Sequence, residues 1–269
     1  MNNVNYLKSA FVILTLAVIV LTNGCNGIEL TGSWRDRDVQ IDGMQFDWEN
    51  ALFNLSDEKV NIGILNDDDY LYVCLVPLDE TIIRQAMRQG FTVWLEAKGD
   101  KAKKLGIRYP IGMMDGGLPP REPDQGFNPE EMMAKAEESL NEFQIIGADK
   151  KDTISLSVDN ESGVQVRVGT RNERMVYELK IPLNRSDDHP YAVGVSPGEE
   201  IKIKFETGQF KRPEMNRPRG ERPDGRMPSG GMPGGGRGMR PDSGMRPEMP
   251  QPMKLDVKVK LAKSNSEAN

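Results

Sequence analysis

The sequence has 269 residues, with 35 basic and 41 acidic side chains and a formal net charge of -6. This acidic balance makes nucleic acid an unlikely class of partner, and we expect none. A single histidine, His189, excludes a multi-histidine zinc site and a histidine-based nucleophile system, and we expect it in a solvated loop. We therefore expect no catalysis and assign no metal or cofactor.

The first 24 residues have the pattern of a cleaved export signal. Lys8 provides a basic start, and Ala10 to Leu21 form an apolar run that is too short to span a bilayer. The junction Thr22-Asn23-Gly24-Cys25 resembles that of bacterial lipoproteins. This resemblance implies that Cys25 becomes the lipidated N-terminus and that the protein is anchored, outside the cytoplasm, to a membrane of the cell envelope. The alternative is a plain secretory signal.

The mature chain has one thiol besides Cys25. Removing residues 1–24 takes away one lysine and no acid, so 34 basic and 41 acidic residues remain, a net charge of -7. Cys74 lies in the apolar run from Leu71 to Val76, which is typical of a buried strand. Since no intramolecular disulfide is available, stability must come from a hydrophobic core, and the length suits one sizeable β domain.

Short segments of alternating apolar residues predict an all-β fold, an antiparallel β-sandwich. Tyr70 to Val76 is apolar on both faces and is placed centrally. A helix is expected from Glu80 to Arg88, followed by a strand from Phe91 to Leu95. The alternating positions are Val60, Ile62 and Ile64; Val164, Val166 and Val168; Met175, Tyr177, Leu179 and Ile181; Ile201, Ile203 and Phe205; and Leu255, Val257, Val259 and Leu261.

The sandwich is expected to span residues 36–210 and 253–263, between a tether at 25–35 and a tail at 264–269. A helical insertion is expected within residues 111–142, because Asn128-Pro129-Glu130-Glu131 has the form of a helix start. The helix from Pro129 to about Glu142 can pack one face on the sandwich. That face holds Met132, Met133, Ala136 and Leu140.

Residues 211–252 contain no Val, Ile, Leu, Phe, Trp or Tyr, so we expect a disordered loop. The loop is a degenerate repeat, since Arg212-Pro213-Glu214-Met215 recurs as Arg246-Pro247-Glu248-Met249. Residues 211–253 hold nine basic and five acidic side chains, a net charge of +4. Because strands are predicted on both sides, we place the loop within a terminal hairpin.

Several sequence pieces follow one another in a recognisable order. They are Ile41-Asp42-Gly43, Trp48, Asn66-Asp67-Asp68-Asp69-Tyr70-Leu71-Tyr72-Val73, Asp79 and Gly90-Phe91-Thr92-Val93-Trp94-Leu95-Glu96. In this order they resemble the carbohydrate-binding module family 9-like sandwiches, which are related to DOMON domains. The resemblance covers roughly residues 36–110, and it implies a non-catalytic module that binds a glycan or another extracellular ligand. It also implies an aromatic clamp from residues 77–90 and 207–252, where Phe210 is the one aromatic residue, so the ligand-binding residues are left unassigned.

The conspicuous side chains of these pieces are expected to be structural. For Trp34, Trp48 and Trp94 we favour packing in or beside the core over a ligand platform. Calcium occurs in some relatives, but three adjacent acids cannot all face one ion, so a solvated turn is favoured for Asp67, Asp68 and Asp69. Haem, which other relatives bind, is disfavoured because His189 is the one histidine.

Two other functions remain open. Seven methionines between Met215 and Met253 offer soft thioether donors for copper outside the cytoplasm, although a flexible spacer is favoured. The second open function is a structural or assembly role, in which loop 211–252 contacts an anionic surface polymer or a partner protein.

Overall fold

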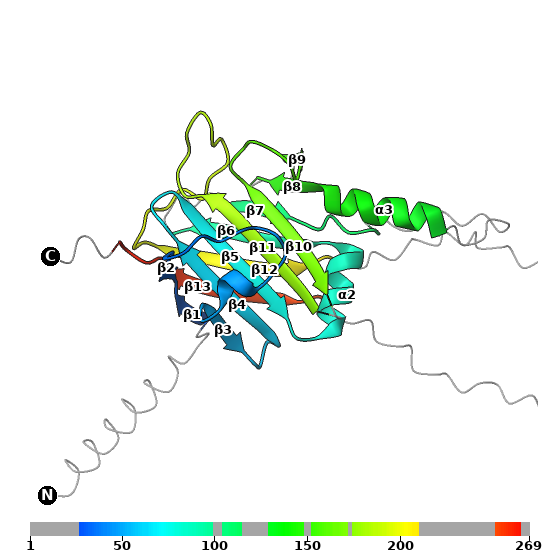
Figure 1. The fold of residues 1–269 in the computed structure, drawn as a ribbon, viewed down its shortest axis with the longest axis horizontal. Coiled ribbons are helices and arrows are strands. Elements are labelled where there is room, and N and C mark those ends of the chain that lie inside the picture. The colour runs from blue at the N-terminus through cyan, green and yellow to red at the C-terminus, as the bar shows by residue number, and fades with distance from the viewer. Residues whose placement is uncertain are drawn as a thin grey trace, which may run out of the picture.

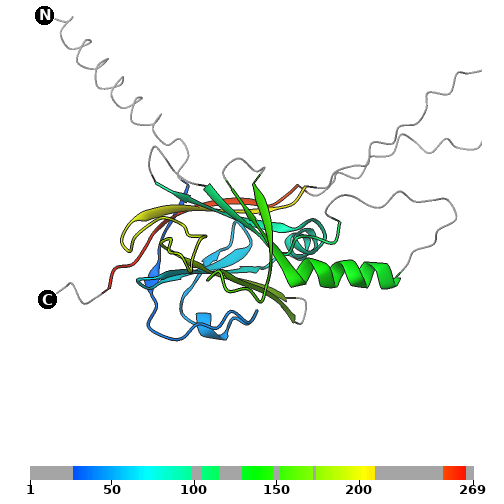
Figure 2. The same cartoon turned by 90° about the horizontal axis from the view of Figure 1, so that it is seen from above.

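The computed structural model describes residues 27–98, 104–114, 129–147, 152–171, 174–209 and 251–264. The predicted signal at 1–24, Cys25, most of the predicted loop at 211–252 and all but Ser264 of the tail lie outside these ranges. Two mostly antiparallel sheets pack face to face as a sandwich (Figures 1 and 2), which confirms the predicted fold class.

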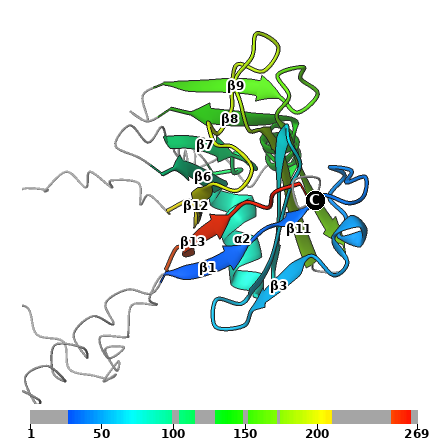
Figure 3. The ribbon, with the colours of Figure 1, turned by 90° about the vertical axis from the view of Figure 1, so that its left-hand side faces the viewer.

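Sheet A has seven strands, which Figure 3 shows side by side. Their order is β1 (Ile28–Thr31), β13 (Lys254–Lys260), β12 (Glu200–Thr207), β6 (Phe91–Ala97), β7 (Lys104–Arg108), β8 (Glu142–Ile146) and β9 (Thr153–Ser157). Sheet B has six strands. Their order is β10 (Gln165–Arg171), β11 (Arg174–Pro182), β5 (Tyr70–Pro77), β4 (Val60–Asn66) and β2 (Ser33–Trp34), with β3 (Leu52–Leu55) also paired to β4.

The sheets are mixed rather than purely antiparallel. Strand β1 pairs in parallel with β13, and β2 pairs in parallel with β4. Residues 28–31 and 33–34, predicted to belong to a tether, therefore form edge strands of both sheets, and this part of the prediction is wrong. Ile28 and Leu30 pack on the core, but an alternating pattern of four residues is too short to stand out in a sequence.

The main core lies between the sheets and is built from the alternating positions that the sequence predicts, such as Ile62, Tyr177 and Val257. A second hydrophobic cluster lies on the outer face of sheet B. There Tyr72, Cys74 and Val76 of the central strand β5 are covered by residues 36–51, including Trp48. Strand β5 is thus buried on both faces, as predicted. We call residues 36–51 the strap; they contain the 3-10 helix η1 (Phe46–Trp48).

Helix α2 (Glu80–Gln89) closes one end of the sandwich and carries the chain from β5 in sheet B to β6 in sheet A. Asp79 caps it, accepting a hydrogen bond from the Thr81 N–H at 2.7 Å. The ammonium of Lys59, 2.7 Å away, and this N–H together lower the pKa of Asp79 to about 2. The predicted helix from Glu80 is confirmed.

Two other segments meet the sandwich at the α2 end (Figures 1 and 2). Helix α3 (Pro129–Asn141) confirms the predicted insertion helix, but Met133 is 72% exposed, whereas Ser139 is buried and Leu140 packs on the core. Residues 208–253, which we call the tongue, connect the antiparallel neighbours β12 and β13. No helix in the described part of the chain is long and apolar enough to cross a membrane.

Candidate functional site

The strap is held on sheet B by one buried carboxylate. Glu178 of β11 points outward and accepts hydrogen bonds from the Asp42 N–H (3.0 Å), the Gly43 N–H and the Trp48 indole N–H (2.6 Å). Gly43 has φ +80°, and a Cβ there would lie 2.5 Å from the Gly169 nitrogen. The Ile41-Asp42-Gly43 turn and Trp48 therefore serve as a clasp between strap and sheet.

Burial raises the pKa of Glu178 to about 6, and the three donors only partly oppose this effect. The side chain is fully buried, and its negative charge has no cationic partner within hydrogen-bond distance among the described residues. The hydrogen bonds to Glu178 fix the backbone of the strap at Asp42 and Gly43, and so they position the residues that follow, including Gln45.

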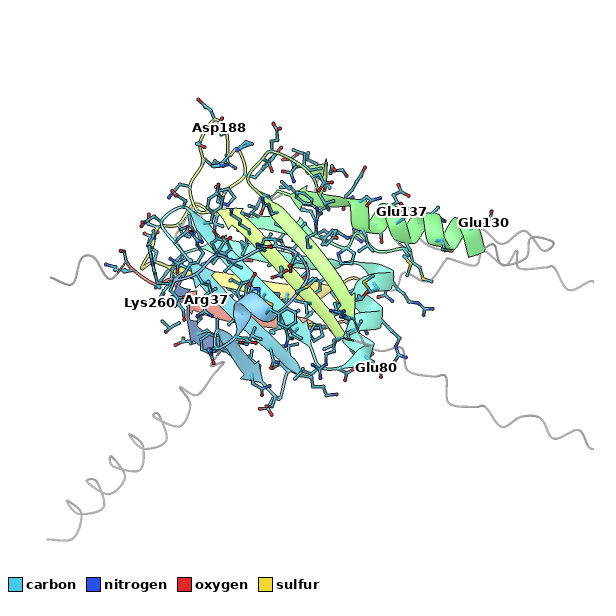
Figure 4. All side chains as sticks on the ribbon, viewed as in Figure 1. Arg37, Glu80, Glu130, Glu137, Asp188 and Lys260 are labelled. Atoms are coloured by element: carbon cyan, nitrogen blue, oxygen red, sulfur yellow. The ribbon has the colours of Figure 1, made fainter. Side chains whose placement is uncertain are left out.

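A groove of about 380 Å³ lies at the end of the outer face of sheet B, beside Gln45 of the strap and the end of β5, where Val76 is one of its lining residues. Five elements contribute to it: the strap, β4, β5, the start of α2 and the start of β11. Figure 4 labels Glu80 at the end of α2 that faces this region. The lining residues are Gln45, Asn61, Val76, Pro77, Leu78, Glu80, Ile83 and Arg174. We call it the strap groove.

The polar groups of the strap groove are largely free to bind a ligand. Asn61 uses its carbonyl oxygen to accept a hydrogen bond from Asn54 at 2.7 Å. The side chains of Gln45, Glu80 and Arg174 are exposed and make no hydrogen bond or ion pair within the described ranges. An amide, a carboxylate and a guanidinium are therefore available around an apolar floor.

Exposed apolar side chains gather at the same place. Leu78, which lines the groove, is 54% exposed, and Phe46 and Met44, on either side of the lining residue Gln45, are 66% and 46% exposed. Among the described residues the other large apolar side chains with comparable exposure are Met133 and Ile154, on α3 and β9. Clustered exposed apolar groups beside unpaired polar groups are typical of a binding site.

The acidic run before β5 forms a closed local network. Asp67 accepts hydrogen bonds from the N–H groups of Asp69 and Tyr70 and from Arg35 Nε, at 3.0, 2.7 and 2.7 Å. Burial alone would raise the pKa of Asp67, but these donors outweigh it and lower the pKa. Within the described residues no group of three or more histidine, cysteine or acidic side chains is placed to hold a metal ion.

His189 lies beside this network, with Nε2 3.1 Å from the Tyr70 hydroxyl. Its ring packs edge-on against Tyr70, at 5.7 Å between centroids. The sequence analysis expects a solvated His189. In the structure His189 does lie in a loop, but it is half-buried because its ring contacts Tyr70. The contact ties the 183–193 loop to β5.

The outer face of sheet A carries a second groove, of about 510 Å³, beside β1, β13, β12 and β6. Charged side chains on this face largely neutralise one another across the strands. Their pairs are Lys98–Glu200, Lys104–Glu96, Lys202–Asp256, Lys204–Glu206 and Lys258–Glu29. Because these charges are already paired, this groove is the weaker candidate.

Two of the three tryptophans, Trp48 and Trp94, are buried by packing in or beside the core, as expected. Trp48 is fully buried under the strap, and Trp34 is half-buried in β2. Trp94 is 5% exposed on the outer face of sheet A, where its indole N–H donates to Glu206 at 3.1 Å and Lys104 lies over its ring. Phe210 and the lipidation candidate Cys25 lie outside the described residues.

The strap groove was not predicted from the sequence. Pro77, Leu78, Glu80 and Ile83 lie in the region, 77–90, that the family resemblance indicated, but that resemblance named no binding residue there. Gln45, Asn61 and Arg174 come from separate elements and belong to no motif, so folding alone brings them together.

Comparisons with known proteins give a distant structural similarity. No protein-family model and no curated protein matches the chain. A carbohydrate binding module family 9 from Caldicellulosiruptor kristjanssonii in complex with cellotriose has a TM-score of 0.34 and 12% identity over 66% of this chain and 75% of that one. The same module in complex with glucose has a TM-score of 0.33 and 11% identity over 68% of this chain and 78% of that one.

Proposed function

We propose that the chain is a non-catalytic binding protein whose strap groove holds a glycan. The observation that carries this proposal is the convergence of Gln45, Glu80 and Arg174, all unpaired among the described residues, around one groove, with the exposed Phe46 next to Gln45 in the chain. The groove volume of about 380 Å³ suits one or two sugar rings.

A sugar matches both kinds of surface in the groove. Its hydroxyl groups each donate and accept hydrogen bonds, so an amide, a carboxylate and a guanidinium can all bind them. Its C–H faces pack on apolar and aromatic side chains, here Leu78 and Phe46. The pinned strap reduces the entropy that would be lost on ordering Gln45 and Phe46 around a ligand.

Calorimetry of residues 26–269 against a panel of mono-, oligo- and polysaccharides that includes glucose and cellotriose tests the proposal. Arg174→Ala removes a charged hydrogen-bond donor, so we expect about a tenfold or greater loss of affinity, and Phe46→Ala should weaken binding by a similar factor. Ile154→Ala is the matched control, since Ile154 is 45% exposed on β9, away from the groove.

Each other outcome has a definite meaning. Absence of binding across the panel contradicts glycan binding. Binding that both groove variants leave unchanged places the glycan elsewhere, for example on the outer face of sheet A. Binding of a protein in place of a sugar would assign the exposed Met44, Phe46 and Leu78 to a partner interface.

We also propose that the protein is exported and anchored through a lipid on Cys25, on the strength of the apolar run and the Gly24-Cys25 junction. In a bacterial host, the full chain should incorporate labelled palmitate and sediment with membranes, and Cys25→Ser should abolish both. Unlabelled protein released in soluble form would support the alternative of a plain secretory signal.

A further inference from the structure

Two arginines lie opposite each other at the edge of the strap groove. Arg174 of β11 lines the groove, and it is the antiparallel partner of Arg171 in β10. Side chains of such partners lie on the same face of a sheet, with Cβ atoms about 5 Å apart. That face is the outer face of sheet B, because a Cβ on Gly169, which shares a side of β10 with Arg171, would meet Gly43 of the strap. Arg171 therefore lies beside the groove, next to a residue that lines it.

The positive charges of this arginine pair are not neutralised. Arg171 and Arg174 are both exposed, and within the described part of the chain neither side chain makes an ion pair or a hydrogen bond. Arg167, on the same face of β10, differs in this respect, because it pairs with Asp159 at 2.6 Å. Like charges directly opposite each other destabilise a pair of strands. An anion bound between the two guanidinium groups would remove this repulsion.

The acidic side chains near the groove leave the arginine pair free. Glu80, the acidic residue among those that line the groove, begins α2 and makes no ion pair with either arginine. Two acids of the strap accept hydrogen bonds from the strap itself. Asp42 accepts from the Met44 N–H at 2.8 Å, and Asp47 accepts from the Gln40 N–H at 3.0 Å. The groove thus has a cationic side on the β10–β11 hairpin and a hydrogen-bond acceptor on α2, which packs beside β11 (Figure 1).

We propose that the glycan of the strap groove is anionic, and that its carboxylate or sulfate group binds between Arg171 and Arg174. This inference rests on the proposed function and names the class of its ligand. A guanidinium donates two parallel hydrogen bonds to the oxygens of such an anion, and these charge-assisted bonds are stronger than those to a neutral hydroxyl. The hydroxyl groups of the same sugar are left to hydrogen-bond with Glu80 and Gln45.

Calorimetry of residues 26–269 with three trisaccharides at one ionic strength tests the inference: trigalacturonic acid, a sulfated galactotriose and neutral cellotriose. At least one acidic sugar should bind about tenfold or more tightly than cellotriose, and the tighter of the two identifies the anionic group. Arg171→Gln should remove most of this preference and leave the affinity for cellotriose unchanged. Arg174→Gln should weaken acidic binding by about tenfold or more. Because both arginines are exposed, these variants should fold, as thermal melting would verify.

Arg185→Gln is the matched control, because Arg185 is also exposed but follows the opposite end of β11. It removes the same charge and should leave all three affinities unchanged. Equal affinity for acidic and neutral sugars, or acidic binding that Arg171→Gln leaves intact, would overturn the inference while glycan binding stands. An equal loss in Arg185→Gln would also overturn it, since the preference would then come from overall charge. Absence of binding by all three sugars would overturn both the inference and the proposed function.

Discussion

At the scale of single residues, Glu178 decides where the strap lies. A carboxylate is suited to this position because it accepts from three separate donors, two on the backbone of Asp42 and Gly43 and one on Trp48. An apolar residue there would leave these buried N–H groups without an acceptor, at a cost of about 1–3 kcal/mol each. The cost of burying the carboxylate appears in its raised pKa.

This raised pKa predicts a pH dependence of stability. The folded protein holds a proton on Glu178 up to about pH 6, whereas the unfolded chain releases it near pH 4.5. The unfolded state therefore binds fewer protons between these values, and the free energy of unfolding should fall by up to about 2 kcal/mol as pH rises from 4.5 to above 6. Urea unfolding across this range measures it.

The matched variant isolates the contribution of this one group. Glu178→Gln has no proton to release, so the fall between pH 4.5 and 6 should be smaller, although the amide donor facing three N–H groups should lower stability at every pH. Glu58→Gln, at an exposed position, should follow the parent protein. A Glu178→Gln profile parallel to the parent would show that another group causes the fall.

At the scale of elements, α2 joins the two ends of the tongue. Gln85 of α2 accepts a hydrogen bond from the Thr207 hydroxyl at 3.0 Å and donates one to the carbonyl of Gln251 at 2.9 Å. The Thr207 hydroxyl oxygen in turn accepts from the Met253 N–H at 2.9 Å. This largely buried network ties the end of β12 and the start of β13 to α2 through residues on either side of 210–250.

Shortening the tongue should therefore stabilise the fold. Replacing residues 210–250 by a turn of about four residues lowers the entropy cost of closing the connection by about 2 kcal/mol, provided that the tongue is as disordered as its composition predicts. Urea unfolding should show a gain of this size, and the groove should keep its ligand affinity. Lower stability in the shortened protein would mean that the tongue packs on the sandwich.

At the scale of the whole molecule, the sequence predicts the architecture where alternation is long enough to be read. Strands β4, β11, β12 and β13 have three or more alternating apolar residues, β10 begins within the run Val164, Val166 and Val168, and each of these strands is found in the structure. Strands β1 and β2 were missed because four and two residues hold too little of the pattern. In β9, exposed Ile154 and mostly polar neighbours offer no strong signal.

The candidate site could not be predicted in the same way. Alternation identifies residues that face a core, whereas the strap groove depends on which outward-facing residues are left uncovered when the strap ends. Arg174 and Gln45 are brought together by the pairing of β11 with β5 and by the clasp on Glu178. Neither contact has a local signature in the sequence.

The parallel pairing of β1 with β13 has a consequence for the order of assembly. Ile28 faces Val257, so the first strand of the chain meets its partner only when almost the whole chain is available. Contacts between such distant parts of a chain form slowly, because a large loop must close first. If the chain is exported N-terminus first, as proposed, β1 would cross the membrane before β13. Strand β1 would then stay unpaired until β13 has also been exported.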